Sequence, residues 1–154
     1  MSIPIHYMTI RAFETEDETQ KRVERAIERL LPETAEDNAI RLEQEHTVIE
    51  EGTDMSILKV TLKRKPHIKH TLAILQDMLG SEQCETIVKQ ENRVDEKGAL
   101  YLRIDKNAFI DEHTAKLVDH GNCIHFRIMI EAHPKTRENA LEAVREIFKQ
   151  QRNG

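Results

Sequence analysis

Three segments of this chain alternate apolar and polar side chains with a period of two, the pattern of a β-strand that buries one face. They cover residues 58–63, 100–105 and 124–131. Residues 3–13 are rich in isoleucine and aromatic side chains and predict an opening strand, and residues 40–49 predict a weaker second strand. Strands that are apolar on one side need a covering layer, so helices must complete the core.

The segments between these strands predict that helical layer. Apolar stripes at helical spacing fall within residues 15–32, 66–80, 81–88 and 134–148. Thr15 and Glu18 form a capping box ahead of the first stripe, Pro66 begins the second, and Gly80 ends it. The predicted fold class is α+β, a mainly antiparallel sheet with helices packed on one face. Its order is strand, helix, strand, strand, helices, strand, strand, helix, and we expect residues 1–154 to form a single domain.

Charge is distributed unevenly along the chain. The formal net charge is −5, which argues against a protein that is basic over its whole surface and binds nucleic acid that way. Residues 32–54 hold eight acids and one base, whereas residues 55–76 hold no acid, five lysines or arginines and two histidines. A local basic surface is therefore compatible with the acidic total.

Several function classes find no support in the sequence. No apolar run is long enough to cross a membrane, and the start has no basic region followed by an apolar stretch, so we expect a cytoplasmic protein with no membrane partner. The eight histidines and two cysteines match no metal-binding spacing, and we expect no metal and no cofactor. The five glycines form no phosphate-binding loop or nucleophile elbow. We therefore expect no enzyme, although a site assembled from distant residues would leave no local motif.

The sharpest candidate site lies where a predicted strand ends and a helix begins. It contains four cations, which are Lys63, Arg64, Lys65 and Lys69. A helix N-terminus is already electropositive, so cations there destabilise it, and a bound phosphate would relieve the repulsion. The alternative is a solvated face whose charges meet the acidic residues 32–54 on a neighbouring strand.

Arg103 and Lys106 could extend this basic surface. The alternation places Arg103 opposite to Leu102 and Ile104, on the solvent side of the predicted strand. The alternative is that Arg103 pairs with a glutamate across the sheet and that Asp105 merely caps a short helix.

Three longer stretches carry a family likeness. Residues 94–106 form a turn and strand that end in Leu102-Arg103-Ile104-Asp105-Lys106, residues 119–134 end in Ala132-His133-Pro134, and residues 5–18 contain Thr15-Glu16-Asp17. Together these stretches resemble an archaeal RNA-binding protein family whose members are predicted to be exosome subunits. The resemblance implies a fold like that of the ribosomal protein that binds 5S RNA, and RNA binding as the activity.

One region departs from that family. Its members carry a glycine-rich turn of G-H-x-G-N type, whereas this chain has Glu50-Glu51-Gly52-Thr53-Asp54-Met55, with one glycine and three acids. A contact that this turn makes with RNA in relatives would be altered or lost here. The departure moves the expected contact to residues 63–69.

The sequence thus predicts a module that binds RNA phosphates through a basic surface. Its expected contacts are Lys63, Arg64, Lys65, Lys69, Arg103 and Lys106. The two tyrosines, four phenylalanines and absence of tryptophan favour structured or double-stranded RNA over stacked single strands. The resemblance adds a possible place in an RNA-processing complex. The alternative is a protein-interaction module, either a homodimer joined along a sheet edge or a subunit docked on a larger complex.

Overall fold

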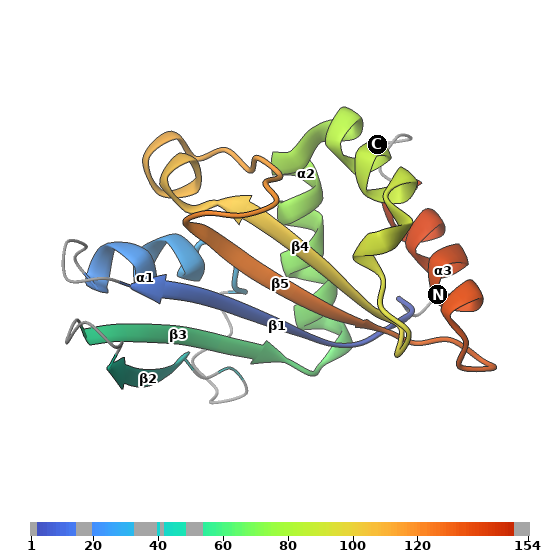
Figure 1. The fold of residues 1–154 in the computed structure, drawn as a ribbon, viewed down its shortest axis with the longest axis horizontal. Helices are drawn as coiled ribbons and strands as arrows, with labels where there is room; N and C mark the ends of the chain where they lie inside the picture. The colour runs from blue at the N-terminus through green and yellow to red at the C-terminus, as the bar shows by residue number, and fades with distance from the viewer. Residues whose placement is uncertain (1–2, 15–19, 33–39, 41, 49–53, 150–154) are drawn as a thin grey trace.

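The computed structural model describes residues 3–14, 20–32, 40, 42–48 and 54–149. The described residues form the α+β fold in the predicted order (Figure 1). The elements are β1 (Ile5–Glu14), α1 (Gln20–Glu28), β2 (Leu42–Val48), β3 (Asp54–Leu62), α2 (Lys65–Lys89), η2 (Glu91–Arg93), β4 (Ala99–Asp105), η3 (Ala108–Glu112), β5 (Cys123–Ile130) and α3 (Arg137–Lys149).

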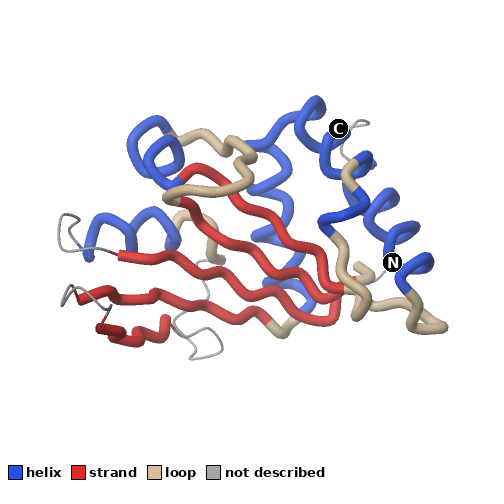
Figure 2. The backbone as a smooth tube through the Cα atoms, viewed as in Figure 1, coloured by secondary structure: helices blue, strands red, loops and turns tan. Residues whose placement is uncertain are grey.

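The strands form one sheet in the order β2-β3-β1-β5-β4, and every neighbouring pair is antiparallel. The helices pack on one face of this sheet, as Figure 2 shows by the separation of helix and strand. The apolar phase of β1, β3, β4 and β5 points toward the helices. On β5, for example, Ile124, Phe126 and Ile128 are almost fully buried, whereas His125 and Arg127 are half-buried on the other face. Period-two alternation therefore decides which side of the sheet carries the core.

Helix α2 begins with Pro66 in its first turn and is interrupted at Gly80, which has φ 80° and ψ 165°. That backbone conformation is accessible almost only to glycine. The predicted division into a first helix ending at Gly80 and a short second helix is confirmed. The capping box predicted at Thr15 and Glu18 lies outside the described residues. Residues 50–53, which form most of the altered turn, also lie outside them.

The outer edge of β4 is covered by the chain itself. Val94 bridges to Leu100, and Leu117 bridges to Ile104. The backbone N–H of Val118 also donates to the carbonyl of Arg103 at 2.9 Å. Covered backbone groups cannot pair with another strand, so edge-to-edge pairing through this part of β4 is blocked. Among the described helices, none is long and apolar enough to cross a membrane.

Candidate functional site

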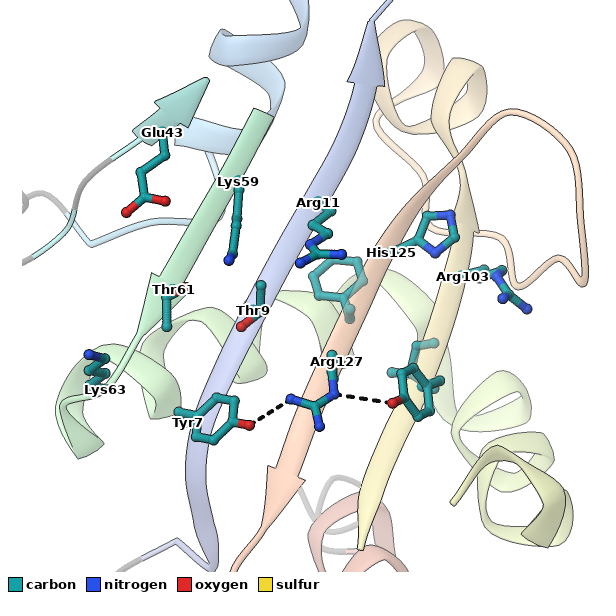
Figure 3. A pocket seen from close by; sticks show the side chains of 13 residues that line it. Tyr7, Thr9, Arg11, Glu43, Lys59, Thr61, Lys63, Arg103, His125 and Arg127 are labelled. Carbon is teal, nitrogen blue, oxygen red and sulfur yellow. Dashed lines mark hydrogen bonds between the residues drawn. The ribbon is translucent and has the colours of Figure 1, made fainter. Parts of the chain in front are cut away.

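The sheet face opposite the helices is open and forms a groove of about 670 Å³ (Figure 3). Side chains from all five strands and Lys63, just past the end of β3, line it, and most of them are polar or charged. The basic ones are Arg11, Lys59, Lys63, Arg103 and Arg127, and the single acid is Glu43. A chain with a net charge of −5 therefore gathers five cations in one groove.

The strand register places the groove residues in rows that run across the strands. In the first row Lys59 on β3 lies opposite Arg11 on β1, Arg11 lies opposite His125 on β5, and His125 lies opposite Arg103 on β4. Glu43 on β2 continues the row beyond Lys59. Side chains directly opposite each other have Cβ atoms about 5 Å apart. The row thus spans the sheet with closely spaced cations.

Most of these cations form no ion pair among the described residues, although Glu43 lies opposite Lys59. Within the described residues, no hydrogen bond or ion pair holds Arg11, Lys59 or Lys63. Arg103 makes only a long contact of 3.4 Å to the carbonyl of Asp119. Like charges directly opposite each other in a sheet are destabilising, and Arg11 and Lys59 are such a pair. The arrangement is one that an anionic ligand lying across the strands would stabilise.

A second row lies next to the first and contains Thr61, Thr9, Arg127 and Tyr101. The guanidinium of Arg127 donates from Nη1 to the Tyr7 hydroxyl at 2.6 Å and from Nε to the Tyr101 hydroxyl at 3.1 Å (Figure 3). It also lies 5.7 Å from the centroid of the Tyr7 ring and 5.9 Å from that of Tyr101. The hydrogen bonds to Tyr101 and then Tyr7 raise the pKa of Arg127.

A carboxylate behind Tyr101 completes this arrangement. The Tyr101 hydroxyl donates to Oδ2 of Asp95 at 3.2 Å. Burial raises the pKa of Asp95, but the backbone N–H groups of Ala99 and Lys97 and the Tyr101 hydroxyl together bring it below its usual range. Asp95 is therefore ionised near neutral pH and acts as an acceptor that orients Tyr101.

His125 sits in the middle of the cation row. Burial lowers the pKa of His125, and the charges of Arg103 and Arg11 on either side lower it further. Its Nε2 lies 3.3 Å from Sγ of Cys123, and its ring meets the Phe13 ring edge-on at 5.6 Å. His125 is thus a neutral histidine at pH 7 that an approaching anion would favour in the protonated form.

The residues expected from the sequence fall into three groups. Lys63 and Arg103 line the groove. Arg103 faces His125 across the sheet rather than a glutamate. Asp105 caps the helical turn that leads into η3, since its Oδ2 accepts the Ala108 N–H at 2.9 Å.

Arg64 and Lys69 are exposed at the start of α2. They are not among the residues that line the groove.

Lys65 and Lys106 both have partners within the protein, Lys65 as a half-exposed side chain and Lys106 as a buried one. The Lys65 ammonium donates to the carbonyls of Ile3 and Ile5 and forms a 2.9 Å ion pair with Glu131. That hydrogen bond holds the pKa of Glu131 below its usual range. Lys106 has an exposed fraction of 0% and donates to the carbonyl of Phe13. We correct the expectation for Lys106, because a fully buried ammonium group cannot contact RNA. The expectation for Lys65 stays a prediction, and its ammonium group already has partners in the protein.

Sequence reasoning missed Tyr7, Arg11, Lys59, His125 and Arg127 as site residues. Each lies on the polar phase of its strand, so alternation alone predicted an outward direction. The missing information was the strand order, which brings β3, β1, β5 and β4 side by side. Among the described residues, no group of three or more histidine, cysteine, aspartate or glutamate side chains could hold a metal.

The chain is similar to known proteins along most of its length. A family model described as RNA binding matches residues 7–130. The RNA-binding protein PAB1135 of Pyrococcus abyssi is 30% identical over 143 residues, which is 92% of each chain.

Solved structures show the same architecture. The AF2318 protein from Archaeglobus fulgidus superposes with a TM-score of 0.79 at 28% identity over 93% of this chain and 99% of that one. Mth689, a DUF54 protein from Methanothermobacter thermautotrophicus, gives a TM-score of 0.76 at 26% identity over 94% and 98%. Because the family model spans the sheet from β1 to β5, the chain belongs to this RNA-binding family.

Proposed function

We propose that this protein binds RNA across the open face of its sheet, with phosphates seated on the row formed by Lys59, Arg11 and Arg103. The observation that carries the proposal is the row itself, in which cations on three strands lie close together and form no ion pair with a described residue. RNA-binding relatives support the choice of ligand. Lys63 at the end of β3 adds a fourth cation to the groove.

The chain as a whole is acidic, whereas the groove is basic, and this difference favours RNA contact through the groove alone. The net charge of −5 repels a polyanion from most of the surface, whereas the groove attracts it. Binding should therefore be oriented, with RNA confined to one side of the sheet. Phosphate contacts of this type supply affinity and position but carry no sequence information.

The test compares two triple variants by RNA titration at several salt concentrations. The sheet variant carries Arg11→Gln, Lys59→Gln and Arg103→Gln, and the control carries Lys69→Gln, Lys89→Gln and Lys149→Gln on the exposed helix layer. Four phosphate contacts to single-stranded RNA predict a log–log salt slope of about −3, and the sheet variant should lose about 2 of these units. The control should keep the wild-type slope. A loss confined to the control variant would place the RNA on the helices and overturn the proposal.

Three finer predictions from the sequence stay predictions. They are the place in an RNA-processing complex that the resemblance implies, the absence of enzyme activity, and the homodimer. For the homodimer, β2 is the sheet edge that remains, because β4 is covered by the chain itself.

A further inference from the structure

Tyr7, Arg127 and Tyr101 come from three neighbouring strands and form a connected unit beside the cation row. Arg127 on β5 lies between Tyr7 on β1 and Tyr101 on β4, and it donates a hydrogen bond to each hydroxyl. Asp95 accepts from the Tyr101 hydroxyl and fixes that end of the unit. Tyr101 is also the one large hydrophobic side chain that is exposed among the described residues, at 38%.

The two hydrogen bonds determine how the guanidinium is presented. Its N–H groups lie in the plane of the group, so bonds to a hydroxyl on either side hold that plane between the two tyrosines. Figure 3 shows Arg127 reaching toward Tyr7 on the open face of the sheet, and its Nε donates to Tyr101 on the other side. A guanidinium held in this way is pre-organised, since little rotamer freedom remains to be lost on binding. It offers a flat cationic surface flanked by aromatic rings.

We propose that this unit is a seat for an unpaired nucleobase, and that the RNA recognised by the groove is single-stranded where it crosses the sheet. Arginine planes and aromatic rings on a sheet are surfaces on which unpaired bases stack. In a duplex the faces of the bases are covered by neighbouring bases, so they cannot reach such a surface. This inference rests on the proposed function and specifies its ligand.

The spacing of the two rows fits one nucleotide. Arg127 lies two residues from His125 on the same strand, which is about 7 Å along the sheet. A strand of RNA can therefore place phosphates on Lys59, Arg11 and Arg103 while a base reaches the Tyr7–Arg127–Tyr101 unit. The expectation of double-stranded RNA rested on the scarcity of aromatics in the whole chain. The fold changes that expectation by gathering both tyrosines of the chain in the groove.

The test uses Arg127→Lys, with Arg25→Lys as its matched control, because Arg25 is exposed on α1 and does not line the groove. Both changes keep the charge and remove the planar group, but only Arg127 belongs to the proposed seat. The probes are an unstructured single-stranded oligonucleotide, the same strand in a duplex, and the same strand with abasic positions. We expect Arg127→Lys to weaken single-strand binding about tenfold with an unchanged salt slope, because one stacked base is lost and no charge is. Arg25→Lys should bind like the wild type.

Further outcomes separate this inference from the proposed function. Wild-type protein should prefer the single strand over the duplex and lose affinity for the abasic strand, whereas Arg127→Lys should be insensitive to the missing bases. Equal binding by Arg127→Lys and Arg25→Lys would overturn the seat and leave the phosphate row intact. A sheet triple variant that binds like the wild type would instead overturn the row. The double variant Tyr7→Phe with Tyr101→Phe keeps both rings but removes the two hydroxyls that hold the guanidinium. It should lose an intermediate share of the single-strand affinity. The same variant replaces Arg127→Lys in the test if Arg127→Lys does not fold.

Discussion

RNA binding should strengthen as the pH falls, and His125 should be responsible. His125 lies between Arg11 and Arg103 in the cation row. Burial, then Arg103, then Arg11 lower the pKa of this histidine in the free protein. A phosphate seated on the row brings negative charge beside the ring and raises that pKa in the complex. The RNA complex therefore binds a proton more readily than the free protein does.

The size of this effect follows from the spacing of the row. A phosphate near His125, at about the 5–6 Å that separates neighbouring side chains, interacts with its positive charge by about 0.7 kcal/mol in water and about 3 kcal/mol at a surface dielectric of 20. For a half-buried ring in physiological salt we take about 1 kcal/mol, which corresponds to roughly fivefold in affinity. The gain appears as the pH falls through the pKa of the complex and is complete below that of the free protein.

The assay is the Kd of one unstructured RNA between pH 8 and pH 5.5 at fixed ionic strength. Wild-type protein should bind about fivefold more tightly at the acidic end, and His125→Gln should lack that part of the change. His70→Gln is the matched control, because His70 is exposed on α2 in the helix layer. Identical pH profiles for wild type and His125→Gln would show that no phosphate sits beside this ring, and the placement of the RNA backbone would be refuted.

Two further predictions concern residues outside the groove. Lys106→Ala removes a fully buried side chain and a donor to the Phe13 carbonyl, so urea denaturation should show a loss of about 2–4 kcal/mol, with the RNA salt slope of the folded variant unchanged. If the variant kept full stability but bound RNA more weakly, Lys106 would be an exposed RNA contact and not a buried structural residue. Gly80→Ala forces a Cβ onto a backbone at φ 80° and ψ 165° and should lower the free energy of unfolding by about 1–3 kcal/mol without affecting RNA binding. A melting temperature equal to the wild type would refute that strain.

The fold could be predicted from the sequence because its local signals agree with one another. Alternation at residues 58–63, 100–105 and 124–131 predicted three of the strands, and Gly80 correctly divided the second helical segment. Antiparallel pairing followed from strands that are apolar on one side. What local patterns did not contain was the order β2-β3-β1-β5-β4, which depends on contacts between segments far apart in the chain.

The candidate site was predicted only in part for the same reason. Lys63 and Arg103 were found because each stands out within its own segment. Arg11 and Lys59 are single basic residues in ordinary strands, and only the register places one opposite the other. Tyr7 and Tyr101 are the two tyrosines of the chain, a scarcity that the sequence shows directly. Because they lie far apart along the chain, the sequence does not show that both contact Arg127.

Clustered cations have different causes along the chain and across the sheet. Along the chain, the cations at the start of α2 predict a ligand from local sequence alone. The fold satisfies Lys65 with Glu131, a carboxylate 66 residues away, and with the carbonyls of Ile3 and Ile5. Across the sheet, Arg11 and Lys59 face each other, and no described residue forms an ion pair with either of them, although Glu43 lies opposite Lys59. The like-charge pair that the fold leaves uncompensated is therefore the better indicator of where a polyanion binds.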